Sequence, residues 1–333
     1  MFLEASQSAD AVARALAENA NVVKALAARF RAKAPSVVLT CARGSSDHAA
    51  TYARYLIETN VGVITSSAPL SISSVYDRTP DLKGALYIAI SQSGRSPDLI
   101  ACVEAARKQG AFVLAMVNDV NSPIASLANE TLALSAGAET SVAATKSFIA
   151  ALAAILHLVG EWSDDADLKR ARVALSGQLA QAWALDWSSA AARLQHAANL
   201  FVIGRGLGLA VAQEAALKFK ETCGIHAEAF SAAEVMHGPL ALARPGFPAF
   251  VLAQSDATLP SVEAAGDAFA ARGADVISAG VQRAGALPTL DAHPAAQPIL
   301  LAQSFYRMAN SLAVTRGFDP DRPPHLNKVT ETV

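Results

Sequence analysis

Charged residues and cysteines are both scarce in this sequence. Of its 333 residues only 17% are Asp, Glu, Lys or Arg, and the 27 basic residues nearly balance the 29 acidic ones, for a formal net charge of −2. No dense cluster of Lys and Arg occurs, so nucleic acid is excluded as a main partner. The three cysteines, Cys41, Cys102 and Cys223, lie far apart and form no Cys-x-x-Cys motif. They are predicted to be small core residues in a reducing compartment.

Long apolar runs, a signal peptide and metal-ligand patterns are also lacking. No run reaches the roughly 18 apolar residues that a membrane span requires. The N-terminal residues Glu4, Ser6, Gln7 and Asp10 are polar, unlike a signal peptide. No group of Cys, His and carboxylate residues has the spacing of a metal site. The sequence therefore predicts a cytoplasmic protein that uses no metal and no membrane. Its 52% hydrophobic residues suffice for two domains with full cores.

The most informative segment joins a predicted strand to a predicted helix. An apolar run at 85–90 indicates a buried strand, and 98–110 indicates a helix with Ser96 as its N-cap and Pro97 in its first turn. Free N–H groups at such a helix N-terminus bind phosphate well, and nearby hydroxyls come from Ser91, Ser93 and Ser96. The nucleotide-binding pattern Gly-x-x-x-x-Gly-Lys-Ser/Thr is absent. We therefore expect a small phosphorylated metabolite as the ligand.

A long internal repeat indicates two copies of one domain. The strand predicted at 37–41 has a counterpart at 200–204, an offset of 163 residues from 37 to 200, and each strand leads into a small-residue loop and a helix. Strands that alternate with helices predict parallel sheets covered on both faces. The predicted fold class is thus α/β, with two tandem doubly wound parallel-sheet domains of the flavodoxin-like, three-layer kind.

Ligands of such sheets bind at the carboxyl ends of the strands, where the Gly44–Ser46 loop and the Ser91–Ser96 loop both lie. In the second copy of the repeat, the counterpart of the Ser91–Ser96 loop is Gln254-Ser255-Asp256, which has a carboxylate where the first copy has Gly94. A carboxylate repels phosphate, so we expect phosphate to bind the first copy only. The predicted boundaries are an N-terminal helical segment at 1–34, a first domain at 35–165, a linker with a bridging helix at 166–190, a second domain at 191–320 and a C-terminal tail at 321–333.

A second candidate site lies on the helix predicted after residue 204. Glu214, Lys218 and Glu221 fall within one narrow stripe of that helix. The stripe is typical of a solvated surface with an i,i+4 ion pair, and equally of a carboxylate that transfers protons beside a lysine. His237 precedes Gly238-Pro239, where a helix must end, so it either meets the helix dipole or donates a proton to a ligand.

A nicotinamide cofactor is not expected. Glycines 204, 206 and 208 lack the six-residue Gly-x-Gly-x-x-Gly spacing, and no clear strand that ends in an acidic residue follows them. No other cofactor is indicated.

Taken together, these segments resemble the SIS (sugar isomerase) family, in particular the isomerase half of glucosamine-6-phosphate synthase and the stand-alone SIS-type glucosamine-6-phosphate deaminases. The resemblance covers almost the whole chain. The segments that carry it, in order, are Gly44–Ser46, Ser91–Ser96, Gly137–Phe148, Glu214–Glu221, His237–Leu242 and the tail Leu326–Thr330.

The resemblance implies specific roles. Glu221 would move a proton between C1 and C2 of an open-chain sugar, supported by Lys218 and Glu214. His237 would open the ring and, in relatives, reaches the site from the neighbouring subunit, which implies a homodimer with shared active sites. Lys328 would cover the site and meet the carbonyl end of the substrate. The residues implied to bind the sugar phosphate are Gly44, Ser45, Ser46, Ser91, Gln92, Ser93, Ser96, Glu139, Val142 and Ala143.

Three departures from the family pattern matter. Arg95 stands where relatives often carry an acidic residue, and it either adds charge near the phosphate or faces solvent. The tail after Lys328 lacks the usual Ser-Val-Thr ending. The chain opens Met1-Phe-Leu-Glu4, without an N-terminal cysteine nucleophile, so we expect that glutamine is not the nitrogen donor within this chain.

The resemblance thus implies a deaminase that converts glucosamine 6-phosphate to fructose 6-phosphate and ammonia without a cofactor. Other amino-sugar or fructosamine phosphates, and isomerisation without amine loss, remain open as alternatives. A non-catalytic sensor of sugar phosphates is the alternative from a different class. Sensors of this kind carry a DNA-binding domain of roughly 70–80 residues, longer than the segment before the first predicted strand.

Overall fold

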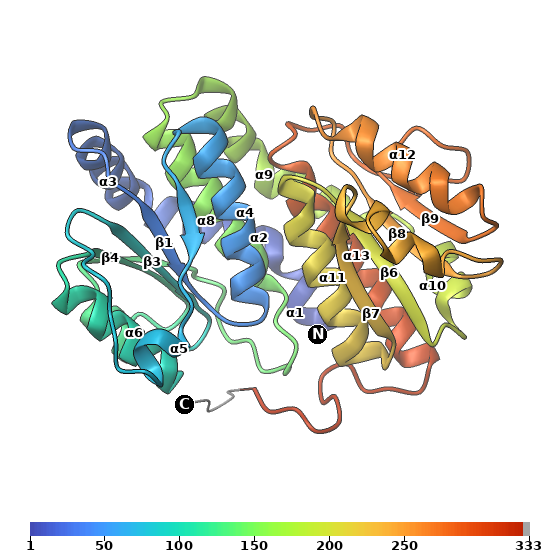
Figure 1. The fold of residues 1–333 in the computed structure, drawn as a ribbon, viewed down its shortest axis with the longest axis horizontal. Coiled ribbons are helices and arrows are strands. Elements are labelled where there is room, and N and C mark those ends of the chain that lie inside the picture. Colours follow the sequence, from blue (N-terminus) through green and yellow to red (C-terminus); the bar gives the residue numbers. More distant parts are fainter. Residues whose placement is uncertain (329–333) are drawn as a thin grey trace. The chain divides into compact units, whose positions relative to one another are not determined.

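The computed structural model of the protein describes residues 1–328 and divides them into two compact units. The first-sheet unit comprises 10–139, 146–173 and the chain from 327, and the second-sheet unit comprises 1–9, 140–145 and 174–326. Each unit holds one parallel sheet between helices (Figure 1), which confirms the predicted α/β class with two doubly wound domains.

The first-sheet unit contains a five-stranded parallel sheet in the order β2-β1-β3-β4-β5, the flavodoxin-like order. Its strands are β1 (Val38–Cys41), β2 (Thr65–Ser67), β3 (Leu86–Ser91), β4 (Phe112–Val117) and β5 (Glu130–Ala133). Its helices are α2 (Ser8–Glu18, which starts in the other unit), α3 (Ala20–Ala32), α4 (Ser45–Asn60), α5 (Ser71–Ser74), α6 (Pro97–Lys108), α7 (Pro123–Leu127) and α8 (Lys146–Trp162).

Both faces of this sheet are covered, so its central strands are apolar throughout. All six residues of β3 are buried. Leu99 and Val103 of α6 pack with Tyr87 and Ala89 of β3 in one apolar cluster, whereas α3 and α4 pack against α8 (Figure 1). The sequence predicted this strand and the helix after it because a continuous apolar run and a Ser-Pro start are local signals.

The second-sheet unit contains a four-stranded parallel sheet in the order β7-β6-β8-β9. Its strands are β6 (Asn199–Gly204), β7 (His226–Ser231), β8 (Pro248–Leu252) and β9 (Asp275–Ala279). Its helices are α1 (Phe2–Ser6), α9 (Ala166–Ala184, which starts in the other unit), α10 (Ser188–Leu194), α11 (Leu207–Cys223), the 3₁₀ helices η1 (Glu234–Met236) and η2 (Pro239–Leu242), α12 (Leu259–Ala270) and α13 (Gln297–Thr315).

Aromatic rings fill the two faces of this second sheet. On one face Phe201 meets Phe247 with ring centroids 4.9 Å apart and Phe269 of α12 at 6.2 Å. On the other face Phe219 of α11 and Phe305 of α13 approach to 5.1 Å in a T-shaped pair. Such pairs add stability beyond their buried area, so α11 and α13 are fixed to each other as well as to the sheet.

The predicted internal repeat is visible in the matching order of elements. The series β1–α4–β2–β3–α6–β4 corresponds to β6–α11–β7–β8–α12–β9. Gly44 before α4 has φ/ψ of 54°/−131°, and Gly206 before α11 has 59°/−131°, so both helices begin with the same turn. Positive φ at that turn favours glycine.

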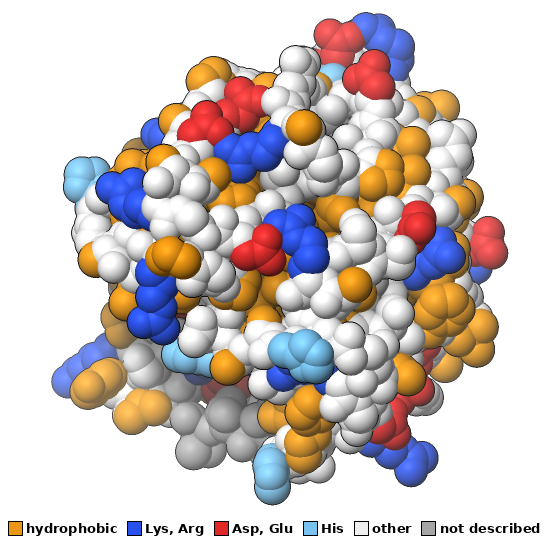
Figure 2. All heavy atoms as spheres, turned by 90° about the vertical axis from the view of Figure 1, so that its right-hand side faces the viewer, with side chains coloured by type: hydrophobic (Ala, Val, Ile, Leu, Met, Phe, Trp, Pro, Cys, Tyr) orange, Lys and Arg blue, Asp and Glu red, His pale blue; other side chains and the backbone are white. Residues whose placement is uncertain are grey.

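Within residues 1–328, no helix combines the length and apolar character needed to cross a membrane. On the face shown in Figure 2, basic and acidic side chains are interspersed among neutral and apolar ones rather than gathered into a continuous basic surface.

One histidine in the core of the first-sheet unit is buried without polar partners. The His157 side chain in α8 is 2% exposed, and neither ring nitrogen has a hydrogen-bond partner among the described residues. Burial, together with the positive charges of Arg172 and Lys24, lowers the pKa of His157 to about 4. The folded protein therefore holds a neutral imidazole at this position.

We expect His157 to make the fold acid-sensitive. The unfolded imidazole takes up a proton near pH 6.5, but the folded one does so only near pH 4. The free energy of unfolding is therefore unaffected by His157 above pH 6.5. It falls as the pH drops from 6.5 towards 4, by up to ~1.4 kcal/mol per pH unit. In thermal melts, His157→Leu should reduce the fall in Tm between about pH 7.5 and pH 5, and His196→Leu at an exposed position should not. Equal pH dependence of wild type and His157→Leu would contradict this account.

Candidate functional site

The two predicted phosphate loops lie at the carboxyl ends of neighbouring strands of the first sheet. β1 ends at Cys41 and pairs in parallel with β3, which ends at Ser91. Gly44 then turns the chain into α4, which Ser45 and Ser46 begin, and the N–H of Ser46 donates to the carbonyl of Arg43 at 3.1 Å. The first loop is thus a tight turn at a helix N-terminus, as predicted.

The Ser91–Ser96 loop is held in shape by its own hydroxyl groups. Ser91 Oγ accepts a hydrogen bond from the N–H of Gly94 at 3.0 Å, and Ser93 Oγ accepts one from the N–H of Arg95 at 3.3 Å. Gly94 has a φ of 63°, and a Cβ there would lie 2.2 Å from Ser122 Oγ. Only glycine fits this turn, so the loop shape is tightly determined.

An ion pair between a half-exposed arginine and a buried aspartate connects the two loops. The Nε and terminal nitrogen of Arg43 both lie 2.9 Å from Oδ2 of Asp98, whose side chain is completely buried in the first turn of α6. Asp98 Oδ1 accepts from the N–H of Leu99 at 2.8 Å. Arg43 precedes the first loop and Asp98 follows the second, so the pair fixes the distance between the two helix N-termini.

Arg95 is exposed and paired with a residue of another loop. Its guanidinium pairs with Asp119 Oδ2 at 2.8 Å, on the loop after β4, and its hydrogen bond lowers the pKa of that carboxyl. Of the two alternatives for Arg95, its exposure agrees with a side chain that faces solvent, and Asp119 balances its charge.

The corresponding loop of the second sheet is filled by its own side chains. Asp256 Oδ1 accepts hydrogen bonds from the N–H and the hydroxyl of Thr258, and its Oδ2 accepts from Gln254 Nε2 at 3.0 Å. Ser255 donates to Gln297 through its N–H and its hydroxyl. These donors of Gln254, Ser255 and Thr258 are thus paired within the chain. Binding of phosphate at the first sheet only stays a prediction.

The acidic and basic residues of α11 form a buried chain of charges. Glu214 is fully buried, Lys218 is 1% exposed and the Glu221 side chain 21%. Lys218 Nζ lies 3.5 Å from Glu214 Oε1 and also donates to Glu221 Oε2. Burial disfavours the ammonium, but the two carboxylates outweigh this and raise the pKa of Lys218. The alternative of a solvated stripe is therefore wrong, because the stripe is covered by the rest of its unit.

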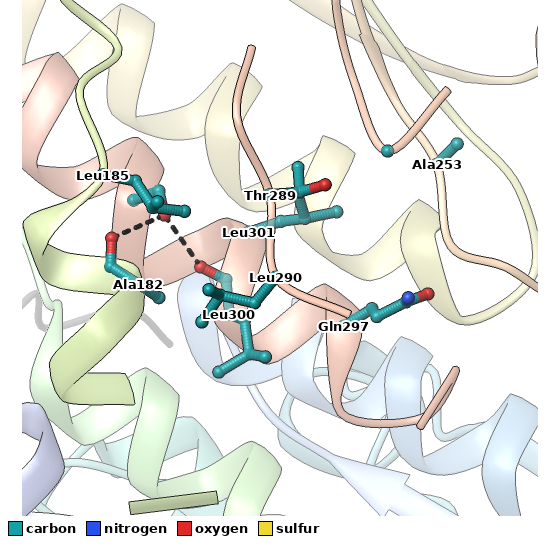
Figure 3. A pocket seen from close by; sticks show the side chains of 10 residues that line it. Ala182, Leu185, Ala253, Thr289, Leu290, Gln297, Leu300 and Leu301 are labelled. Carbon is teal, nitrogen blue, oxygen red and sulfur yellow. Dashed lines mark hydrogen bonds between the residues drawn. The ribbon is translucent and has the colours of Figure 1, made fainter. Parts of the chain in front are cut away.

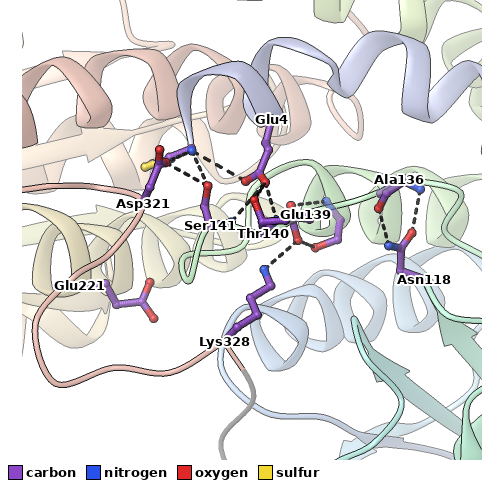
Figure 4. A network of polar contacts seen from close by, with 12 residues as sticks. Glu4, Asn118, Ala136, Glu139, Thr140, Ser141, Glu221, Asp321 and Lys328 are labelled. Carbon is purple, nitrogen blue, oxygen red and sulfur yellow. Dashed lines mark hydrogen bonds and ion pairs between the residues drawn. The ribbon is translucent and has the colours of Figure 1, made fainter.

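Glu139 and Lys328, two further candidates, meet in the first-sheet unit (Figure 4). The carboxylate of Glu139 is buried and accepts from Ser147 at its N–H and its hydroxyl, at 3.2 and 2.5 Å. Lys328 Nζ lies 3.4 Å from the same carboxylate. The tail lysine thus has a defined partner. Thr330 of the predicted tail motif lies outside the described residues.

Val142, Ala143 and His237 belong to the second-sheet unit. The N–H of Val142 donates to the carbonyl of Asp321 at 3.1 Å, and Ala143 is buried. His237 follows η1, is exposed, and precedes Gly238 with a φ of 134°. The break after His237 was predicted from Gly-Pro, and it leaves the imidazole at the surface rather than in the core.

Sequence reasoning missed several residues that hold these candidates in place. Glu4 Oε1 accepts from the N–H groups of Thr140 and Ser141 at 2.5 and 3.2 Å (Figure 4). Its hydrogen bonds outweigh burial and lower its pKa. Asp98 could have been found from the sequence, because an acidic residue in the first turn of a helix is a recognisable local pattern. Glu4 could not, since its partners lie more than 130 residues away along the chain.

The pocket shown in Figure 3 is lined by other residues. It lies beside α13 in the second-sheet unit. Leucines and alanines make up most of its lining, and Ser304 Oγ there donates to the carbonyls of Ala182 and Leu300 at 2.8 and 3.3 Å. None of the predicted site residues lines it.

Comparison with known proteins identifies the sequence pattern. The family model of the SIS domain matches residues 32–159 and 193–281. The chain is 34% identical over 324 residues to the glutamine–fructose-6-phosphate aminotransferase (isomerizing) of Aeropyrum pernix, and 33% identical over 299 residues to that of Sulfurisphaera tokodaii. These alignments cover 87% of this chain but 50% and 49% of the relatives. The chain thus spans about half the length of the curated relatives it matches.

Solved structures match over nearly the whole chain. A protein from Silicibacter pomeroyi, provisionally assigned as a phosphosugar isomerase, is 42% identical with a TM-score of 0.92, covering 96% of this chain and 99% of that one. The glucosamine-6-phosphate deaminase of Thermotoga maritima has a TM-score of 0.76 at 21% identity, over 97% of this chain and 100% of that one. At that identity the likeness shows the fold alone.

We expect Asp98→Asn to weaken phosphate binding. The change leaves Arg43 without its buried anionic partner and loosens the link between the two loops, so the dissociation constant for a hexose 6-phosphate should rise about tenfold, the scale of one charged hydrogen bond. Calorimetric titration measures it. Asp119→Asn, which breaks the exposed pair with Arg95, is the matched control and should change affinity by less than about twofold. Unchanged affinity in folded Asp98→Asn would refute the role of this pair.

Proposed function

This chain belongs to the SIS family, and we propose that it is a phosphosugar isomerase that converts glucosamine 6-phosphate to fructose 6-phosphate and ammonia. The observation that carries the proposal is the buried Lys218 ammonium between the carboxylates of Glu214 and Glu221. A protein tolerates buried charges at a cost in stability, so their presence on one face of α11 favours chemistry over structure. The 42% identity to the Silicibacter pomeroyi protein and the similarity to the glutamine–fructose-6-phosphate aminotransferases support a sugar phosphate as the substrate.

The phosphate group would bind at the first sheet. The N-terminus of α6 and the hydroxyls of Ser91, Ser93 and Ser96 supply donors, and the N-terminus of α4 supplies a second positive dipole. Arg43 is committed to Asp98 and Arg95 to Asp119, so recognition would rest on neutral donors and helix dipoles. Neutral donors and helix dipoles would bind a phosphate monoester and still allow the product to be released.

In the proposed reaction His237 protonates the ring oxygen while the C1 hydroxyl gives its proton to water, so the C1–O5 bond breaks and C1 becomes an aldehyde. Glu221 then takes the proton from C2 while water donates a proton to the C1 carbonyl oxygen, which gives an enolamine. Glu221 returns the proton to C1, and the amine-bearing carbon becomes an iminium that water hydrolyses to the ketone and ammonium. Delocalisation of the carbanion over the enolamine makes the step feasible without a metal, and Lys328 would meet the carbonyl end.

We expect purified protein to release ammonia and fructose 6-phosphate in equal amounts from glucosamine 6-phosphate. Glu221→Gln should lower the rate by roughly 10²–10⁴-fold, the contribution of a positioned acid/base, while substrate still binds. Glu104→Gln on the exposed face of α6 is the control and should keep full activity. Coupled assays for both products measure the outcome.

Other outcomes would select the alternatives. Turnover of galactosamine 6-phosphate or a fructosamine phosphate in place of glucosamine 6-phosphate would change the substrate and keep the chemistry. Ketose formed without ammonia would indicate isomerisation alone. Tight binding with no turnover of any hexosamine phosphate would refute the enzyme and favour a sensor.

We further propose a homodimer with shared active sites. His237 is exposed and flanked by the exposed apolar residues Met236 and Leu242, at 44% and 55%. An apolar surface around a catalytic group is typical of a subunit contact. His237 would then complete the site of the neighbouring copy.

Mixing two inactive variants tests this arrangement. Glu221→Gln and His237→Ala subunits, after exchange, should recover about a quarter of wild-type activity, because half of the dimers are hybrids and each hybrid has one intact site. Each variant alone, taken through the same exchange procedure, is the control. No recovery despite verified hybrid formation would mean that each site is built from one chain.

A further inference from the structure

We propose that Tyr306 is a positioning residue for the proton relay of α11. Tyr306 lies on α13 with its side chain fully buried, and its hydroxyl donates to Glu214 Oε1 at 2.9 Å. Glu214 in turn holds Lys218, which contacts Glu221. The inference rests on the proposed role of Glu221 and extends the relay by one group from a different helix.

The electrostatics explain why this hydroxyl matters. A carboxylate without solvent exposure keeps its charge only if donors satisfy it. For Glu214 these donors include the Lys218 ammonium and the Tyr306 hydroxyl. The hydroxyl therefore helps Glu214 to remain anionic, and the anion shares the Lys218 ammonium with Glu221. Without the Tyr306 hydroxyl, Glu214 would be protonated more readily, and Lys218 would then pair with the carboxylate of Glu221 alone.

Among the described residues of α13, β6, β7 and β8, which pack against α11, no other charged group contacts Lys218. Glu214 and Glu221 are the charges that act on it. β6 and β8 carry no ionisable side chain, and the charged residues of β7, His226 and Glu228, are exposed. On α13, Arg307 donates to the carbonyl of Trp183, and Arg316 at its C-terminal end donates to the carbonyl of Cys223. The thiol of Cys223 is neutral, since burial raises its pKa to about 11.

Removing the hydroxyl has a predictable direction. In Tyr306→Phe, Glu214 loses a donor and takes up a proton more readily, so the repulsion between Glu214 and Glu221 falls. Lys218 then stabilises only the Glu221 carboxylate. The acidic limb of the kcat profile against pH should therefore move to lower pH, and the tighter ion pair makes Glu221 a weaker base.

The test compares Tyr306→Phe with Tyr52→Phe, which removes a hydroxyl from another fully buried tyrosine, on α4 of the other unit. Tyr306→Phe should lower kcat for ammonia release about tenfold, with KM changed less than about twofold, and should shift the acidic limb by about half a pH unit or more. Tyr52→Phe should leave the profile in place. A lower kcat with an unmoved profile would mean that Tyr306 is structural only.

A double-mutant cycle keeps the inference testable if Tyr306→Phe is unstable. Glu214→Gln removes the charge that Tyr306 satisfies, so it should shift the acidic limb in the same direction. Adding Tyr306→Phe to it should cost less than about twofold further in kcat. Independent, multiplicative losses would overturn the proposal. The same four proteins also give a cycle in thermal stability, which tests the Tyr306–Glu214 link even if no hexosamine phosphate is turned over and the proposed function fails.

Discussion

One buried ammonium group constrains much of the second-sheet unit. Lys218 is fully enclosed, so its charge requires anionic partners, and these are Glu214 and Glu221 at one turn on either side. Glu214 is enclosed as well and requires a further donor, which α13 supplies through Tyr306. The contacts of α11 with α13 are therefore both apolar, through Phe219 and Phe305, and polar, and the polar contact fixes their register.

The carboxyl ends of the two sheets share a backbone turn but differ in their charged groups. In both, a glycine with positive φ starts the helix after the first strand of the repeat. At the first sheet the ion pair of Arg43 and Asp98 joins the two loops, and serine hydroxyls lie along the second loop. At the second sheet Asp256 supplies an anion from within the chain. Similar backbone geometry thus coexists with different electrostatics.

Local signals made most of the fold predictable from sequence. The strand at Leu86–Ser91, the helix from Pro97 and the repeat follow from apolar runs, Ser-Pro starts and glycine exits, which depend on neighbouring residues only. The charged stripe of α11 was ambiguous because its burial depends on elements far along the chain, including α13. The same limit applies to the pairing of Arg43 with Asp98, 55 residues apart, since each residue alone is unremarkable. Interactions across sequence distance decided the site, and local patterns do not encode them.

The difference between the two edges has a consequence for how the protein responds to its surroundings. A ligand that binds only the folded state stabilises it by an amount that grows with the free ligand concentration. If phosphate esters bind the first sheet, the resistance of that unit to local opening and proteolysis would follow metabolite supply. The anion of the second sheet is Asp256, which is covalently part of the chain and always present at the same effective concentration. During scarcity the first-sheet unit would thus open more often, while the second would keep its stability.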